Sequence, residues 1–241
     1  MKDNCSRKFW CGRAAENIAR GILVAFVALA ISGIASAQGK QDNKDEFALE
    51  LLSNVSTPTA ITPPVGNHLF LAGHAFGSQG YVCLPKDGSV SWTVNGARPE
   101  ATLFASVFGE PVQVITHFLS HDDNPNDPTL PVAFGNATWQ SSFDTSKVWA
   151  SASPETTIAA GTDPSCPNTG SISCLLLTAL GTEKGPTGGE ILAKTTFVQR
   201  LNTKGGSAPS NPATGCLFLT DVGHQVLVPY TADYFFWRAD N

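Results

Sequence analysis

The chain has 241 residues, of which 15 are lysine or arginine and 20 are aspartate or glutamate, so its formal net charge is −5 at pH 7. Phosphate contacts need clustered positive charge, and the basic residues beyond position 20 are scattered, so nucleic acid is excluded as a predicted partner. The length is sufficient for one domain with a sizeable core.

Residues 1–37 have the pattern of a secretory signal peptide. Five basic residues precede an uncharged, mostly apolar run from Gly21 to Ala37, which ends in the small-x-small cleavage site Ala35-Ser36-Ala37. The run is shorter than the ~20 strongly apolar residues of a spanning helix, although an uncleaved anchor is the alternative. We expect cleavage before Gln38, a secreted or periplasmic location, and no stable membrane insertion of the mature chain, whose net charge would be −8.

Beyond the leader, residues 38–62 are polar and broken by Pro58, which indicates a linker or N-terminal arm. Residues 63–241 form the predicted domain. Short β-favouring runs alternate there with glycine, proline and asparagine turn signals, at 68–72, 80–84, 90–94, 112–118, 147–151, 174–180, 190–201, 216–220, 225–230 and 233–237. This spacing, without a long 3.6-residue period, predicts an all-β, single-domain antiparallel β-sandwich or barrel.

Four cysteines follow the expected cleavage site: Cys83, Cys166, Cys174 and Cys216. In an oxidising compartment they would form two disulfides, and four cysteines allow three pairings. Cys166 and Cys174 flank a turn signal and could clip a loop, in which case Cys83 and Cys216 would close a much longer one. The cysteines have neither the Cys-x-x-Cys spacing nor the histidine partners of a zinc site, and a Gly-x-Gly-x-x-Gly motif after a strand is absent, so no metal or cofactor is predicted.

Several blocks occur in a recognisable order: 80–83, Trp92, 99–103, His117-Phe118, Trp139, 175–177, 199–206, Cys216 and 228–236. In this order they resemble the secreted bacterial and fungal family catalogued as domain of unknown function 3455, over roughly residues 63–238. The resemblance implies an exported β-rich domain and no particular reaction.

The chain departs from the family pattern in two places. Cys174 stands where the family usually has tryptophan, and residues 119–135 are an extra segment between the His-aromatic pair and the next tryptophan. Cys166 and Cys174 lie in and beside a further segment that is extra to the family pattern, whereas Cys83 and Cys216 occupy family-like positions. This division supports the pairing of Cys83 with Cys216 and of Cys166 with Cys174.

Three patterns for catalysis or metal binding are incomplete. His117 and His121 have the spacing of helical zinc ligands but lie at a strand end, and 122–127 has the spacing of calcium ligands without the glycine and glutamate of an EF-hand. Gly77-Ser78-Gln79-Gly80 is close to a nucleophile elbow, but Phe76 replaces its first glycine. Paired carboxylates for hydrolysis would have to come from dispersed residues, namely Glu100, Glu110, Asp144 and Glu190.

Five residues are the candidates for a ligand or structural site: His117, Trp139, Arg200, Asp233 and Tyr234. For Arg200 we expect a carboxylate partner on a neighbouring strand, Asp233 first, which would fix strand register rather than perform catalysis. The aromatic residues offer either core packing or a platform for a flat ligand. The sequence thus favours an exported small-ligand- or carbohydrate-binding or structural module over an enzyme, with a small molecule or glycan as partner. The alternative is a secreted hydrolase that uses dispersed carboxylates or His117.

Overall fold

The computed structural model describes residues 57–94, 100–120, 135–210 and 215–240. The chain divides into two units, Met1–Asp42 and Asn43–Asn241, and every described residue belongs to the second. The expected signal peptide and the arm up to residue 56 therefore lie outside the described residues. Among those residues, no helix has both the length and the apolar character needed to span a membrane.

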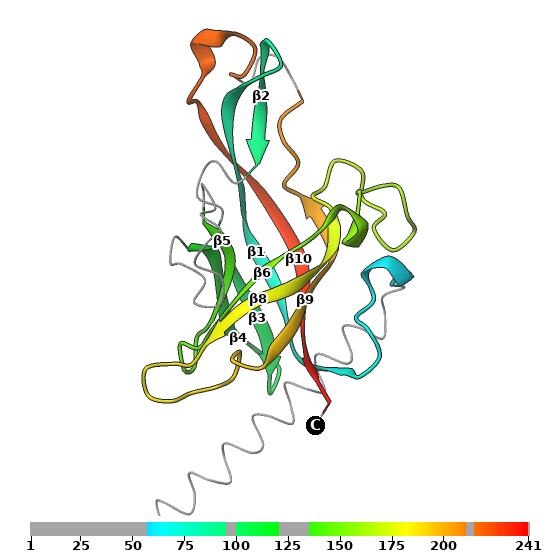
Figure 1. Cartoon of the computed structure of the whole chain (residues 1–241), viewed down its shortest axis with the longest axis vertical. Coiled ribbons are helices and arrows are strands. Elements are labelled where there is room, and N and C mark those ends of the chain that lie inside the picture. Colours follow the sequence, from blue (N-terminus) through cyan, green and yellow to red (C-terminus); the bar gives the residue numbers. More distant parts are fainter. Residues whose placement is uncertain (1–56, 95–99, 121–134, 211–214, 241) are drawn as a thin grey trace, which may run out of the picture. The chain divides into compact units, whose positions relative to one another are not determined.

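Eight antiparallel strands of the described part pair into a closed ring (Figure 1). Each strand of the ring pairs with the next along the chain, and the last pairs back with the first. They are β1 (Asn67–Lys86), β3 (Glu100–Val107), β4 (Glu110–Ser120), β5 (Asn136–Ser141), β6 (Lys147–Ser151), β8 (Cys174–Glu183), β9 (Thr195–Gly205) and β10 (Gln225–Ala239). The all-β antiparallel prediction is confirmed, and of its two architectures this ring corresponds to a barrel.

The remaining elements lie beside the ring. Strand β2 (Ser89–Val94) pairs with the end of β1, and β7 (Thr157–Ile158) pairs with β8. Short 3-10 turns occur at η1 (Thr59–Ile61), η2 (Pro154–Thr156) and η4 (Leu219–Asp221).

Two strands are much longer than predicted. The runs 68–72 and 80–84 belong to the single strand β1, and 225–230 and 233–237 to β10; the two strands lie side by side from Asn67↔Ala239 to Val82↔Gln225 (Figure 1). The glycines between the first two runs are not turn residues. A Cβ atom at Gly77 would lie 2.2 Å from the carbonyl oxygen of Glu100, so glycine there permits the close approach of β3.

Other differences concern single segments. Strands β3 and β5 were not among the predicted runs, because their small and polar residues carry little β propensity. Of the strongest predicted strand, 190–201, only the part from Thr195 is extended, since a turn occupies 190–194. Residues 216–220 form no strand: the Asp221 carboxylate accepts the backbone N–H groups of Leu217 and Phe218 and shapes a turn instead.

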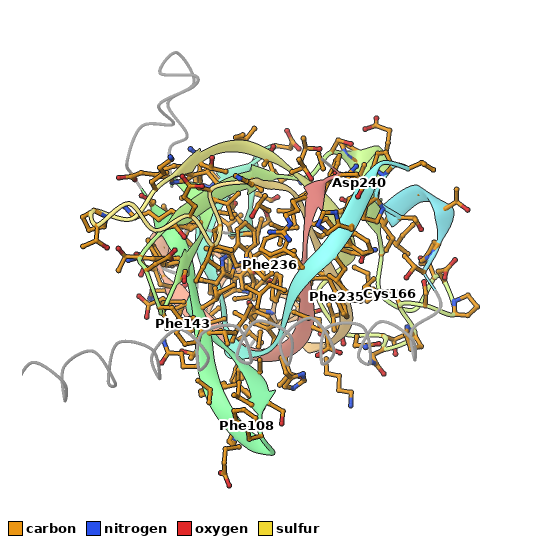
Figure 2. The ribbon with its side chains drawn as sticks, turned by 90° about the horizontal axis from the view of Figure 1, so that it is seen from below. Phe108, Phe143, Cys166, Phe235, Phe236 and Asp240 are labelled. Carbon is orange, nitrogen blue, oxygen red and sulfur yellow. A yellow bond between two sulfur atoms is a disulfide. The ribbon has the colours of Figure 1, made fainter. Side chains whose placement is uncertain are left out.

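Inward and outward side chains alternate and form two cores. On β10, Tyr234 and Phe236 belong to the cluster inside the ring, whereas Phe235 belongs to a second cluster on the outer face, with Cys166 (Figure 2). Ile61 of η1 is fully buried in this outer cluster, and its carbonyl oxygen accepts a 2.6 Å hydrogen bond from the Gln199 side chain. The described end of the expected arm thus covers the outside of the ring.

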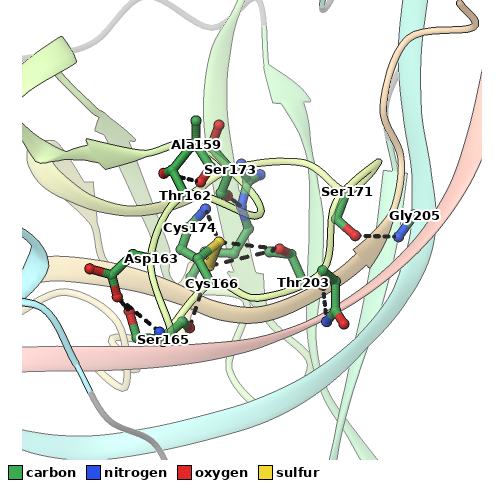
Figure 3. The surroundings of a disulfide bond; sticks show 12 residues. Ala159, Thr162, Asp163, Ser165, Cys166, Ser171, Ser173, Cys174, Thr203 and Gly205 are labelled. Carbon is green, nitrogen blue, oxygen red and sulfur yellow. Dashed lines mark hydrogen bonds between the residues drawn. A yellow bond between two sulfur atoms is a disulfide. The ribbon is translucent and has the colours of Figure 1, made fainter.

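Both expected disulfides are present, Cys83–Cys216 and Cys166–Cys174. The short bridge closes a loop on the outer face, where both sulfur atoms lie 3.8 Å from the Thr203 hydroxyl of β9 (Figure 3). The long bridge ties the end of β1 to the segment before β10.

Candidate functional site

A cavity of about 740 Å³ lies inside the ring, partly open to solvent. Aliphatic side chains of β4, β5, β6 and β8 form much of its wall, namely Leu119, Ala137, Ala150, Leu175, Leu177 and Ala179. The polar side chains come mainly from β1, β4, β9 and β10 and include Gln79, His117, Arg200, Tyr230 and Tyr234. The cavity therefore combines an apolar wall with a group of polar side chains.

The two-residue period of the strands places these polar side chains in the interior. Arg200 of β9 is the register partner of Tyr234 of β10, and His117 of β4 is that of Trp139 of β5. The ring of Tyr234 lies 5.6 Å from the His117 ring and 5.9 Å from the Trp139 ring, measured between centroids. The fold thus brings four of the five sequence-predicted residues to one cavity.

His117 is held in one orientation. Its ring stacks on Trp139 at 4.3 Å with an interplanar angle of 7°, and its Nδ1 donates a 2.8 Å hydrogen bond to the carbonyl oxygen of Thr138. Burial lowers the pKa of His117 to about 4; the bond to Thr138 opposes this effect, and the charge of Arg200 adds to it. The imidazole is therefore neutral at pH 7, with its proton on Nδ1 and a lone pair on Nε2.

Arg200 supplies the positive charge of the cavity. Its Nε donates a 3.0 Å hydrogen bond to the carbonyl oxygen of Ser173, and no carboxylate of the described residues lies within 4.0 Å of its guanidinium. No aspartate or glutamate of the described part lines the cavity. The terminal N–H groups of Arg200 are thus donors without a described acidic partner.

The two tyrosines of β10 form a pair. The hydroxyl oxygens of Tyr230 and Tyr234 lie 3.1 Å apart. Burial, followed by the neighbouring Tyr234, raises the pKa of Tyr230 well above its ordinary value, and the charge of Arg200 only partly offsets this rise. The Tyr230 phenol is therefore protonated at pH 7.

Asp233 does not pair with Arg200, so that prediction is wrong. The two residues lie on neighbouring strands as expected, but Asp233 is the register partner of Leu201, one residue beyond Arg200, and therefore lies on the outer face. One of its carboxylate oxygens lies 2.5 Å from Nδ1 of His74, and the other accepts a 2.7 Å hydrogen bond from the Asn202 amide.

The other sequence patterns lie outside the cavity or outside the described residues. His121 and the loop 122–127 are not described, and in the described part no three His, Cys, Asp or Glu residues group as metal ligands. None of the four dispersed carboxylates lines the cavity. Asp144 accepts hydrogen bonds from the backbone of Ile191 and from Ser146, and Glu190 forms an ion pair with Lys184. The elbow-like segment is an internal part of β1.

Tyr230 and Gln79 line the cavity with polar side chains but were not among the predicted site residues. Tyr230 lies four residues before Tyr234, so the two-residue strand period could have placed it on the same face. Gln79 carries no such signal, because the surrounding glycines indicated a turn.

The closed antiparallel ring of strands, with an interior cavity that mixes apolar and polar groups, defines the class of this protein as a β-barrel with an internal cavity. The chain belongs to the family described as "Protein of unknown function (DUF3455)", whose sequence model matches residues 64–238. This match confirms the resemblance and includes every strand of the ring apart from the last residue of β10. Neither the curated proteins nor the solved structures provide a match to the chain.

Proposed function

We propose that this protein is an exported binding protein whose barrel takes up a small organic anion with an apolar body. The observation that carries the proposal is the Arg200 guanidinium, which faces a cavity without a described carboxylate. A cation in a partly buried site loses hydration, and an anionic ligand restores the lost interaction. A planar guanidinium also fits a carboxylate in a bidentate arrangement.

The wall of the cavity supports an apolar body for the ligand. A volume of about 740 Å³ lies within the usual range of small-molecule sites. Leu175, Leu177 and the aromatic ring of Tyr234 offer apolar contact. A neutral sugar needs hydrogen-bonding partners around most of its surface, so these walls favour an organic acid over a glycan.

The features of the cavity favour binding over hydrolysis. A hydrolase with paired carboxylates needs two of them at one site, and the described cavity wall contains none. A histidine with a pKa of about 4 is a poor general base near pH 7. Export is supported by the leader pattern of residues 1–37 together with two disulfides, which persist in oxidising compartments.

The test is the affinity for 2-naphthoate and for its uncharged isostere 2-naphthamide, measured by isothermal titration calorimetry. Arg200→Gln retains a donor toward Ser173 but removes the charge, and charge-assisted hydrogen bonds contribute about 1.5–3 kcal/mol. We expect this variant to bind 2-naphthoate roughly 10- to 100-fold more weakly and the wild type to prefer the acid over the amide.

Arg238→Gln is the matched control, because Arg238 lies on the neighbouring strand β10 and contacts His68 and the Phe70 ring instead of the cavity. It should bind the acid like the wild type. Equal affinity of the wild type for acid and amide, or full affinity in Arg200→Gln, would contradict the proposed function.

A further inference from the structure

A second polar atom in the cavity lacks a partner among the described residues. His117 uses Nδ1 for its hydrogen bond to Thr138, and no described residue donates a hydrogen bond to its Nε2. A neutral imidazole carries one proton, so the proton on Nδ1 leaves Nε2 as an acceptor only. This acceptor lines the partly open cavity, and a ligand that covers it without a donor would leave it unpaired, at the free-energy cost of a lost hydrogen bond.

The position of this acceptor is fixed on two sides. Stacking on Trp139 sets the plane of the imidazole, and the bond to Thr138 sets its rotation within that plane. Trp139 is itself 1% exposed, so the support beneath the imidazole belongs to the core. The direction in which Nε2 accepts is therefore determined before any ligand enters.

Tyr234 is a neighbour of both this acceptor and the cation. Its ring lies 5.6 Å from the His117 ring, and its register partner on the neighbouring strand β9 is Arg200. Arg200 is bonded to the carbonyl oxygen of Ser173, next to β8, whereas His117 is bonded to that of Thr138 on β5, and β6 separates these two strands in the ring. A ligand whose body covers Tyr234 would have one end near Arg200 and the other near His117. The two polar groups thus recognise two separate ends of one molecule.

We infer that the ligand is a hydroxylated or N–H-bearing organic acid, in which a donor remote from the carboxylate binds Nε2 of His117. This inference rests on the proposed function, since Arg200 must first hold the acid group. His117 then acts as a specificity-determining residue: it rejects acids that lack the donor because they leave Nε2 unpaired.

The test compares 2-naphthoate with the hydroxy-2-naphthoates that carry a hydroxyl on the ring remote from the carboxylate. Calorimetry measures the ratio of each affinity to that of the parent acid, so that changes common to all acids cancel. For the wild type, we expect at least one isomer to bind roughly tenfold more tightly than the parent.

Two substitutions assign this preference to His117. His117→Phe keeps an aromatic ring against Trp139 and removes the acceptor, and His117→Asn provides a second variant that can still donate to Thr138. In both, the preference should fall below about twofold. His74→Phe, the same change on the outer face beside Asp233, should retain it.

The inference is overturned if no isomer binds the wild type more tightly than the parent acid, or if the preference survives both His117 substitutions. The proposed function fails in a different way, namely if 2-naphthoate itself binds without dependence on Arg200.

Discussion

Replacement of both Cys83 and Cys216 by alanine is expected to lower the free energy of unfolding by about 5 kcal/mol in the chain-entropy model. The bridge spans 133 positions, so its loss releases a very long loop in the unfolded chain. The same model predicts only about 2.5 kcal/mol for Cys166→Ala with Cys174→Ala, because that bridge spans 8 positions. Guanidinium titrations of the two double variants at pH 7 measure both losses.

These double variants are matched controls for each other, since each removes one bridge and leaves no free thiol from it. The backbone also bonds Cys83 to His224 and Gly223, so the segment before β10 has a second attachment to β1 that both variants retain. A loss for the short bridge equal to or larger than that for the long bridge would contradict the loop-length account.

Acid is expected to destabilise the protein through His117. The unfolded chain takes up a proton on this side chain near pH 6.5, whereas the folded chain does so only near pH 4, because burial disfavours the imidazolium. Between these values the unfolded state binds more protons, so the free energy of unfolding falls as the pH falls. A difference of this size corresponds to roughly 3 kcal/mol, lost between about pH 7 and pH 4.

Urea titrations of the wild type and His117→Asn across this pH range isolate the contribution. Asparagine does not titrate, so the difference in stability between the two proteins should shrink or reverse as the pH falls below 6.5. Arg200 and Tyr234 face the same imidazole and are unchanged in both proteins, so their own effects largely cancel. A difference that stays constant from pH 7 to pH 4 would contradict the buried neutral histidine.

The sequence predicted the fold class and much of the site for definable reasons. Short β runs with turn residues between them indicated an antiparallel β fold, and His117, Trp139, Arg200 and Tyr234 stood in blocks that resembled the family. Strand alternation explains why these four residues converge: each occupies an inward position of its own strand.

The wrong predictions concern facts that only strand pairing determines. Asp233 and Arg200 are on adjacent strands, but Asp233 pairs with Leu201, the residue after Arg200. Successive residues of a strand point to opposite faces, so this offset of one residue places the two side chains on opposite faces of the sheet. Glycines in β1 indicated turns, although at Gly77 the requirement is space for the neighbouring strand β3. The closure of the ring by β1 and β10 joins residues far apart in sequence, which no local pattern reports.

A crystal structure of the protein with bound 2-naphthoate tests the central claim most directly. We expect the naphthalene body inside the ring against Tyr234, with the carboxylate within hydrogen-bonding distance of the Arg200 guanidinium. A ligand bound only on the outer face, or one inside the ring with its carboxylate directed away from Arg200, would contradict the claim that this cavity is a site for organic anions.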